Sequence, residues 1–177
     1  MSAASQPSLV GFVREITSDL ELGRTAEYAN LADWLKPPLG RSYSRSLPVA
    51  QKFTNAAGHS IVILTLVNPD YLVSGFNPLI DQNHDVLYVF DYTGRIVASS
   101  SEQWYPVDAT MAQSQAVRMV EDNHEYGQYE EKYPASDEDK TFLVNFRTST
   151  KTPATVAVAL SKNRVLDAWK NEAKKVL

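Results

Sequence analysis

The chain has 177 residues, of which 44% are hydrophobic and 21% charged, and its formal net charge is −4. This length and composition are typical of one globular domain and exclude collagen-like, low-complexity and wholly disordered proteins. The acidic balance argues against a nucleic-acid partner, and the absence of cysteine excludes disulfides, zinc fingers, iron–sulfur clusters and thiol nucleophiles.

No membrane-spanning segment is predicted. The longest apolar stretch, Ile61–Val67, is far shorter than the about 20 residues that a spanning helix needs. Residues 1–7 lack the features of a secretory signal, so they are interpreted as a linker or an added end, with a single domain over residues 8–177. Such a chain fits both a complete cytosolic protein and a soluble piece of a larger membrane protein.

Two helices are predicted at the start of the chain. Apolar residues recur at helical spacing between Leu9 and Leu22, and Gly23 is suited to end that helix. A second helix is expected over residues 25–35, where it must end before Pro37 because proline lacks the amide hydrogen.

A hairpin is predicted next, with strands over residues 46–54 and 59–67 joined through Gly58. The second strand is apolar on both faces, which is typical of a central strand in a covered sheet. Asn68 and Pro69 then favour the start of a short helix.

The clearest local signal is a second hairpin over residues 86–100. Asp91 can accept backbone amide hydrogens at the turn, and Gly94 can adopt the left-handed conformation that a tight turn requires.

The remaining segments complete an α+β pattern. The expected elements are a helix within residues 111–120, strands over residues 126–133, 141–148 and 155–160, and a final helix. Trp169 is expected to pack that helix against the sheet. This order favours an antiparallel sheet of about five strands with N-terminal helices and a C-terminal helix.

Motifs of known enzyme classes are absent from the sequence: it has no G-x-S-x-G, no phosphate-binding or dinucleotide-binding glycine loop, and no H-E-x-x-H. His84 and His124 each have nearby carboxylates that could ligate a metal, but a solvated turn explains each cluster better. We therefore expect no catalytic activity, no cofactor and no metal in this chain.

Two segments have the composition of a ligand site. Arg41, Tyr43 and Arg45 would share one side of an extended chain and could bind a carboxylate or phosphate; the alternative is an exposed basic edge. The segment from Trp104 to Arg118 could form a pocket wall, or its aromatic residues could close the core. The candidate ligand residues are Arg41, Tyr43, Arg45, Tyr88, Trp104, Tyr105, Arg118, Asn145 and Arg147.

Three segments, in their order and spacing, resemble one family. They are LVNPDYL (66–72), VLYVFDYTGRIVAS (86–99), and a closing run of LVNFR (143–147), PATVAVALS (153–161) and VLDAW (165–169). They look like the extracytoplasmic PAS-like sensor domains called Cache domains, especially those that precede GGDEF diguanylate cyclase or EAL phosphodiesterase modules.

The resemblance implies an extracytoplasmic, periplasmic part of an inner-membrane receptor, attached through flanking membrane helices. Such a domain binds a small ligand, anionic or amino-acid-like, and signals through its terminal helices to a cytoplasmic cyclase, phosphodiesterase, histidine kinase or chemoreceptor module, commonly as a homodimer. The resemblance assigns no ligand residue. The first alternative is a ligand-free dimerisation module of the same fold, and the second, which the sequence favours less, is a cytosolic enzyme.

Overall fold

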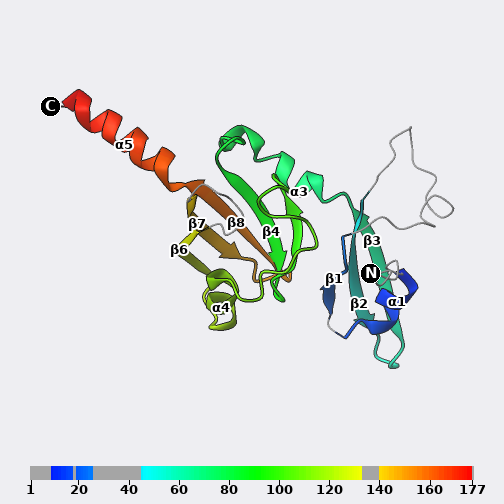
Figure 1. Ribbon diagram of the computed structural model, residues 1–177. Helices are drawn as coiled ribbons and strands as arrows, with labels where there is room; N and C mark the ends of the chain where they lie inside the picture. Colours follow the sequence, from blue (N-terminus) through cyan, green and yellow to red (C-terminus); the bar gives the residue numbers. More distant parts are fainter. Residues whose placement is uncertain (1–8, 18, 26–44, 133–139, 177) are drawn as a thin grey trace, which may run out of the picture. The chain divides into compact units, whose positions relative to one another are not determined.

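The computed structural model describes residues 9–17, 19–25, 45–132 and 140–176, and these form parts of two compact units (Figure 1). The first unit is Met1–Tyr71 and the second is Leu72–Leu177. Each unit has its own antiparallel sheet, so the two are described in turn.

The first unit contains a three-stranded sheet with the order β1-β2-β3. Its elements are α1 (Leu9–Glu15), β1 (Leu20–Leu22), β2 (Leu47–Thr54) and β3 (Ser60–Val67). The predicted helix up to Leu22 is wrong beyond Glu15. The side chain of Glu21 accepts hydrogen bonds from the backbone and hydroxyl of Thr17, and the chain after this turn pairs with β2. The predicted helix over residues 25–35 lies outside the described residues.

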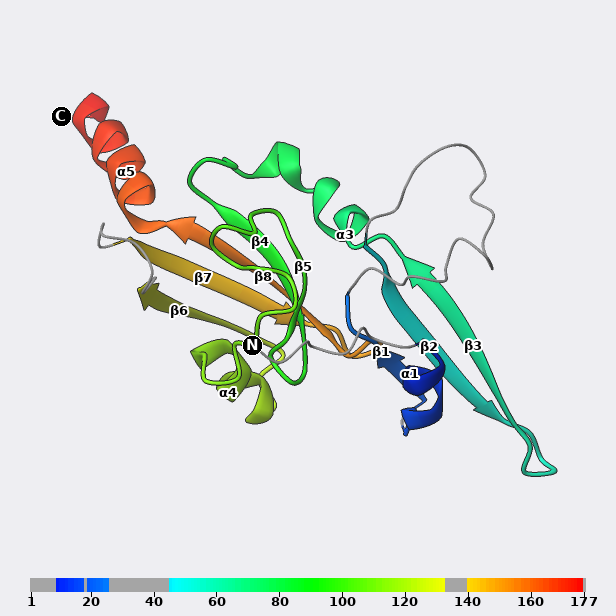
Figure 2. The ribbon, with the colours of Figure 1, turned by 45° about the vertical axis from the view of Figure 1, so that its right-hand side comes forward.

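The β2–β3 hairpin is confirmed, whereas the central position predicted for β3 is wrong. Gly58 has a φ of 81°, and Asn55 Oδ1 accepts hydrogen bonds from the amides of Ala57 and His59. Figure 2 shows β3 at the outer edge of its sheet, with β2 between it and β1. An apolar pattern on both faces therefore does not guarantee a position inside a sheet.

The second unit contains a five-stranded antiparallel sheet with the order β5-β4-β8-β7-β6. Its strands and helices are η1 (Asn77–Leu79), β4 (Val86–Asp91), β5 (Ile96–Ser99), α4 (Gln115–Glu121), β6 (Tyr126–Lys132), β7 (Thr141–Thr148), β8 (Ala154–Ser161) and α5 (Lys162–Val176). The short helix α3 (Asp70–Ser74) spans the boundary between the units, and Asn68 Oδ1 accepts from the Asp70 amide at its start, as predicted.

The β4–β5 hairpin has the turn that the sequence predicts. Asp91 Oδ1 accepts hydrogen bonds from the amides of Thr93 (2.9 Å) and Arg95 (3.0 Å), and Asp91 Oδ2 accepts from the Arg95 guanidinium. Gly94 has a φ of 79°, and a Cβ atom there would lie 2.8 Å from a methyl group of Val117. The turn therefore needs glycine for its conformation and for the close packing of α4.

The core of the second unit lies between one face of this sheet and α4 with its preceding loop. The buried side chains come from alternate positions of β4, β7 and β8, with Ile96 of β5 and Tyr129 of β6, and α4 contributes Ala116 and Val117. The loop is fixed to β5 by backbone hydrogen bonds, including one from Ile96 to Ala109 (2.9 Å) and one from Met111 to Gly94 (2.7 Å). The predicted α+β class is confirmed, with the strands arranged in two antiparallel sheets of three and five strands.

The helix α5 follows β8 directly and projects from the sheet (Figure 1). Trp169 on this helix is 69% exposed, so the prediction that it packs against the sheet is wrong. Across the residues that the structure describes, no helix combines the length and apolarity needed to cross a membrane.

A buried polar cluster and an ion pair at the last helix

Three tyrosines and one glutamate meet under the covered face of the five-stranded sheet. Tyr88 on β4 is fully buried, and its ring stacks on Tyr105 with centroids 4.1 Å apart and planes 13° apart. The Tyr105 hydroxyl donates to Glu131 Oε2 (3.1 Å), and the Tyr129 hydroxyl donates to the same oxygen (3.4 Å). We call these four residues the tyrosine–glutamate cluster.

The cluster contains an unsatisfied polar group. The Tyr88 hydroxyl is buried and makes no hydrogen bond of normal length with a described residue, although the Tyr105 and Tyr129 hydroxyls lie near enough to affect its pKa. Since a buried hydroxyl without a partner costs about 1–3 kcal/mol, such groups are rare and call for an explanation.

Burial determines the titration of the cluster. It raises the pKa of the Tyr88, Tyr105 and Tyr129 phenols, so all three stay neutral hydrogen-bond donors at physiological pH. It also raises the pKa of the Glu131 carboxyl, against the opposing effect of the two phenol hydrogen bonds.

An aromatic side chain and a cation lie next to the cluster. Trp104 makes an edge-to-face contact with Phe142, at 5.7 Å between ring centroids, and Phe142 belongs to the core around Tyr88. The ammonium of Lys140 lies 4.5 Å from the centre of the Trp104 ring. This geometry is a cation–π contact, so the aromatic surface here already attracts an ammonium group.

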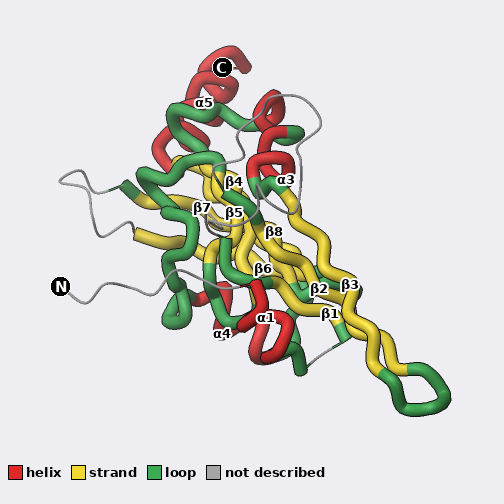
Figure 3. The backbone as a smooth tube through the Cα atoms, turned by 90° about the vertical axis from the view of Figure 1, so that its right-hand side faces the viewer, coloured by secondary structure: helices red, strands yellow, loops and turns green. Residues whose placement is uncertain are grey.

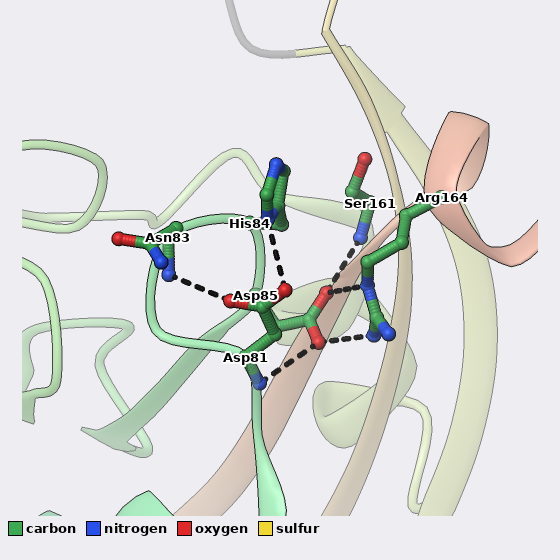
Figure 4. Close-up of polar contacts among 6 residues, drawn as sticks. All are labelled: Asp81, Asn83, His84, Asp85, Ser161 and Arg164. Carbon is green, nitrogen blue, oxygen red and sulfur yellow. Dashed lines mark hydrogen bonds and ion pairs between the residues drawn. The ribbon is translucent and has the colours of Figure 1, made fainter.

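The second buried polar arrangement is centred on Asp85, just before β4 (Figure 4). Its Oδ1 accepts from the Ser161 amide (3.1 Å) and from Arg164 Nε (3.3 Å). Its Oδ2 accepts from Arg164 Nη2 and from the Asp81 amide. Asp85 is 1% exposed, so both oxygens of a buried carboxylate are satisfied, and Arg164 ties the first turn of α5 to the sheet.

Two surface contacts accompany this ion pair. Lys162, the first residue of α5, donates to Glu130 on β6 at 2.7 Å. The side chain of His84 bonds Asp81 at 2.9 Å, and this hydrogen bond lowers the pKa of Asp81. Among the described residues, no group of three histidine or acidic side chains is arranged to hold a metal ion.

The sequence-predicted ligand residues do not all come together in the structure. Tyr88, Trp104 and Tyr105 come together in or beside the cluster. Arg45 lies in the first unit and Arg118 lies on α4, both in exposed positions.

Two other candidates, Asn145 and Arg147, do not face the same side of the sheet as Tyr88. Both are exposed on β7, and the residues between and before them, Phe146 and Val144, point into the core instead. Strand alternation therefore places the two polar side chains on the opposite face of the sheet. The predicted residues Arg41 and Tyr43 lie outside the described residues.

Sequence reasoning missed Tyr129, Glu131, Asp85 and Arg164. A signal for the first two was present, because residues two apart on a strand share a face, and Tyr129 and Glu131 follow this spacing on β6. Nothing local links Asp85 to Arg164, which are 79 positions apart.

Comparison with known proteins identifies the fold. Neither a protein-family model nor a curated protein sequence matches the chain. The chain is similar to the extracellular domains of three proteins assigned as histidine kinases: rpHK1S-Z16 (TM-score 0.57, 15% identity, 90% of this chain), mmHK1S-Z2 (0.56, 10%, 84%) and soHK1S-Z6 (0.51, 14%, 84%).

The chain spans 61% of the length of the first of these structures, 52% of the second and 51% of the third. At this level of identity the similarity concerns the fold. The strand order β5-β4-β8-β7-β6, with α4 and its loop on one face, agrees with the resemblance noted from the sequence. The chain has the fold of the PAS-like sensor domains called Cache domains.

Proposed function

We propose that the chain is the ligand-binding sensor domain of a membrane-bound signalling receptor, lies outside the cytoplasm, and is not itself an enzyme. The ligand binds at the tyrosine–glutamate cluster. The observation that carries this proposal is the buried Tyr88 hydroxyl without a described partner beside the partly buried Glu131, whose pKa burial raises. A polar group that is costly in the free domain is explained when a ligand completes its hydrogen bonds.

The chemistry of the cluster favours a ligand with an amino or ammonium group. Glu131 supplies negative charge, the tyrosine and tryptophan rings attract cations, and Lys140 already occupies one such position over Trp104. An amino-acid-like ligand, as predicted, fits this chemistry through its amine. The predicted anion site depended on arginines, and Arg45, Arg118 and Arg147 are all exposed outside the cluster.

The signal leaves the domain through α5. Binding changes a receptor only by favouring one conformation over another, so the cluster must be coupled to an element that leads out of the domain. The strands β6 and β4 carry the cluster, and Lys162 and Arg164 tie the first turn of α5 to β6 and to the start of β4. The receptor acts as a homodimer, and its output is a cyclase, phosphodiesterase, kinase or chemoreceptor module.

The test is a thermal-shift screen of the chain against amino acids, their decarboxylated amines, polyamines, purines and short carboxylates without an amine. A ligand at 100 times its dissociation constant stabilises the domain by about 2.7 kcal/mol, which raises the melting temperature by several degrees. We expect saturable shifts with amine compounds only.

Two variants locate the site. Glu131→Gln removes the negative charge and should weaken binding about tenfold or more, since hydrogen bonds to charged groups contribute about 1.5–3 kcal/mol. Glu125→Gln makes the same change at an exposed position on the same segment and should leave binding unchanged. A shift that survives Glu131→Gln, or that only carboxylates produce, contradicts the proposed ligand chemistry.

A further inference from the structure

The partly exposed member of the tyrosine–glutamate cluster marks the side from which a ligand reaches it. The side chains of Tyr88, Tyr105 and Tyr129 are buried, whereas Glu131 is partly exposed. Glu131 on β6 lies directly opposite Phe142 on β7, where the two strands run side by side (Figure 3). A ligand therefore approaches the cluster at this end of β6 and β7.

A tryptophan and a lysine lie at the same end of the two strands. Trp104 and Lys140 are both partly exposed. Trp104 meets the ring of Phe142 edge to face, and the Lys140 ammonium lies 4.5 Å from the centre of the Trp104 ring. Since Lys140 directly precedes β7, the chain itself holds an ammonium group beside the approach to the cluster.

The position over Trp104 is also one that the ammonium of a ligand would favour. Tryptophan makes the strongest cation–π contacts of the aromatic side chains. Two ammonium groups repel each other at short distance, so they cannot share the ring face that Lys140 covers. A ligand cation that uses this face must therefore displace the Lys140 ammonium.

We propose that Lys140 is a tethered competitor, whose ammonium covers Trp104 in the free domain and leaves the ring when an amine ligand binds. This inference rests on the proposed function, because it concerns the amine site at the cluster. The flexible stem of a lysine allows a partly exposed ammonium to return to water. The affinity of the site is then set by the exchange of one cation for another, which favours an amine that also contacts Glu131.

The experiment measures the dissociation constants of phenethylamine and putrescine by isothermal titration calorimetry. Lys140→Gln removes the competing cation and should bind the two amines at least about threefold more tightly than the natural chain does. Lys140→Arg keeps a cation that can lie over Trp104 and should bind them as the natural chain does. Circular dichroism and melting temperatures without ligand verify that both variants fold.

Lys132→Gln is the matched control, because it removes the same charge from the same end of the sheet. Lys132 is exposed and directly follows Glu131 on β6, so it projects from the opposite face. Its replacement should change the two affinities by less than about twofold, since solvent and salt screen an exposed charge. An equal gain in Lys132→Gln and Lys140→Gln is a general charge effect and overturns the proposal.

Proton NMR follows the displacement itself. Protons held over an aromatic ring are shifted upfield, and a shifted lysine ε-methylene resonance that is missing from Lys140→Gln belongs to Lys140. In the natural chain, saturating putrescine should move this resonance toward the position of an exposed lysine. A resonance that stays in place at saturation overturns the proposal.

The outcomes separate this proposal from the proposed function. Amine binding by the natural chain that Lys140→Gln does not strengthen overturns the competitor and leaves the ligand site standing. If neither amine binds to the natural chain or to Lys140→Gln, the competitor is overturned as well, and the thermal-shift screen then decides about the ligand site.

Discussion

Two buried polar groups of the second unit, close together in the sequence, differ in their hydrogen bonding. The carboxylate of Asp85 accepts from two backbone amides and from both ends of the Arg164 guanidinium. The hydroxyl of Tyr88, three residues later, has no partner among the described residues. A fully satisfied buried group stabilises one conformation, whereas an unsatisfied one costs free energy until something binds to it. This difference indicates that Asp85 stabilises the fold, and it supports the proposed role of Tyr88 in ligand binding.

The largest effect is expected from Asp85→Ala. The change removes four hydrogen bonds and leaves the Ser161 and Asp81 amides without their acceptor, so we expect a loss of about 3 kcal/mol in the free energy of unfolding. Urea denaturation measures this loss. Asp167→Ala, an exposed acid on α5, is the matched control and should change the stability little. A loss below 1 kcal/mol for Asp85→Ala would contradict a stabilising role for the Asp85 carboxylate.

In the tyrosine–glutamate cluster, removing one polar group is expected to leave the free energy of unfolding unchanged or to raise it. Tyr88→Phe removes a buried hydroxyl without a partner and should leave the stability unchanged or raise it by up to about 1 kcal/mol. Tyr105→Phe removes a hydroxyl that donates to Glu131 and should lower the stability by about 1 kcal/mol. The same denaturation experiment compares the two variants. If the Tyr88→Phe variant is less stable than the Tyr105→Phe variant, the Tyr88 hydroxyl does contribute to stability and the prediction is wrong.

The smallest expected effect is the pH dependence that the Glu131 carboxyl gives to the free energy of unfolding. Its pKa in the folded protein lies above the ordinary value of 4.5, because burial favours the neutral acid. The folded state therefore holds this proton more tightly than the unfolded state, and stability is lost as the pH rises from below 4.5 through the raised pKa.

Glu131→Gln has no proton to lose in this range. The melting temperature of the variant relative to the natural protein should therefore rise between pH 4 and pH 7, as measured by calorimetry in steps of half a pH unit. A difference that stays constant with pH would mean that burial does not penalise the charged form of Glu131.

Local turn chemistry made most of the second unit predictable from the sequence. Asp91 and Gly94 specify the β4–β5 turn through hydrogen bonds and a left-handed conformation within four residues. Asn68 likewise specifies the start of α3. Signals of this kind need no knowledge of distant parts of the chain, so the predicted elements there agree with the structure.

Predictions failed where the outcome depends on distant partners. Residues 20–22 continue a helical pattern, but pairing with β2 makes them a strand. Trp169 was expected to be the contact between the last helix and the sheet, and the Asp85–Arg164 pair makes that contact instead. In the tyrosine–glutamate cluster, the sequence analysis includes Tyr88 and Tyr105 among the candidate ligand residues. The position of Glu131 follows only from knowing which residues of β6 face the core, and the sequence does not establish that.

The absence of a linker between β8 and α5 has a mechanical consequence. Strand β8 ends at Ser161 and α5 begins at Lys162, so no flexible residue can absorb a movement of the strand. The 15 residues of α5 form a rod of about 22 Å at 1.5 Å per residue. A tilt of about 5° at its root moves the far end by about 2 Å, the radius of the helix backbone. If the chain is the sensor domain proposed above, a small rearrangement around its ligand would therefore give a displacement large enough to change how neighbouring helices pack.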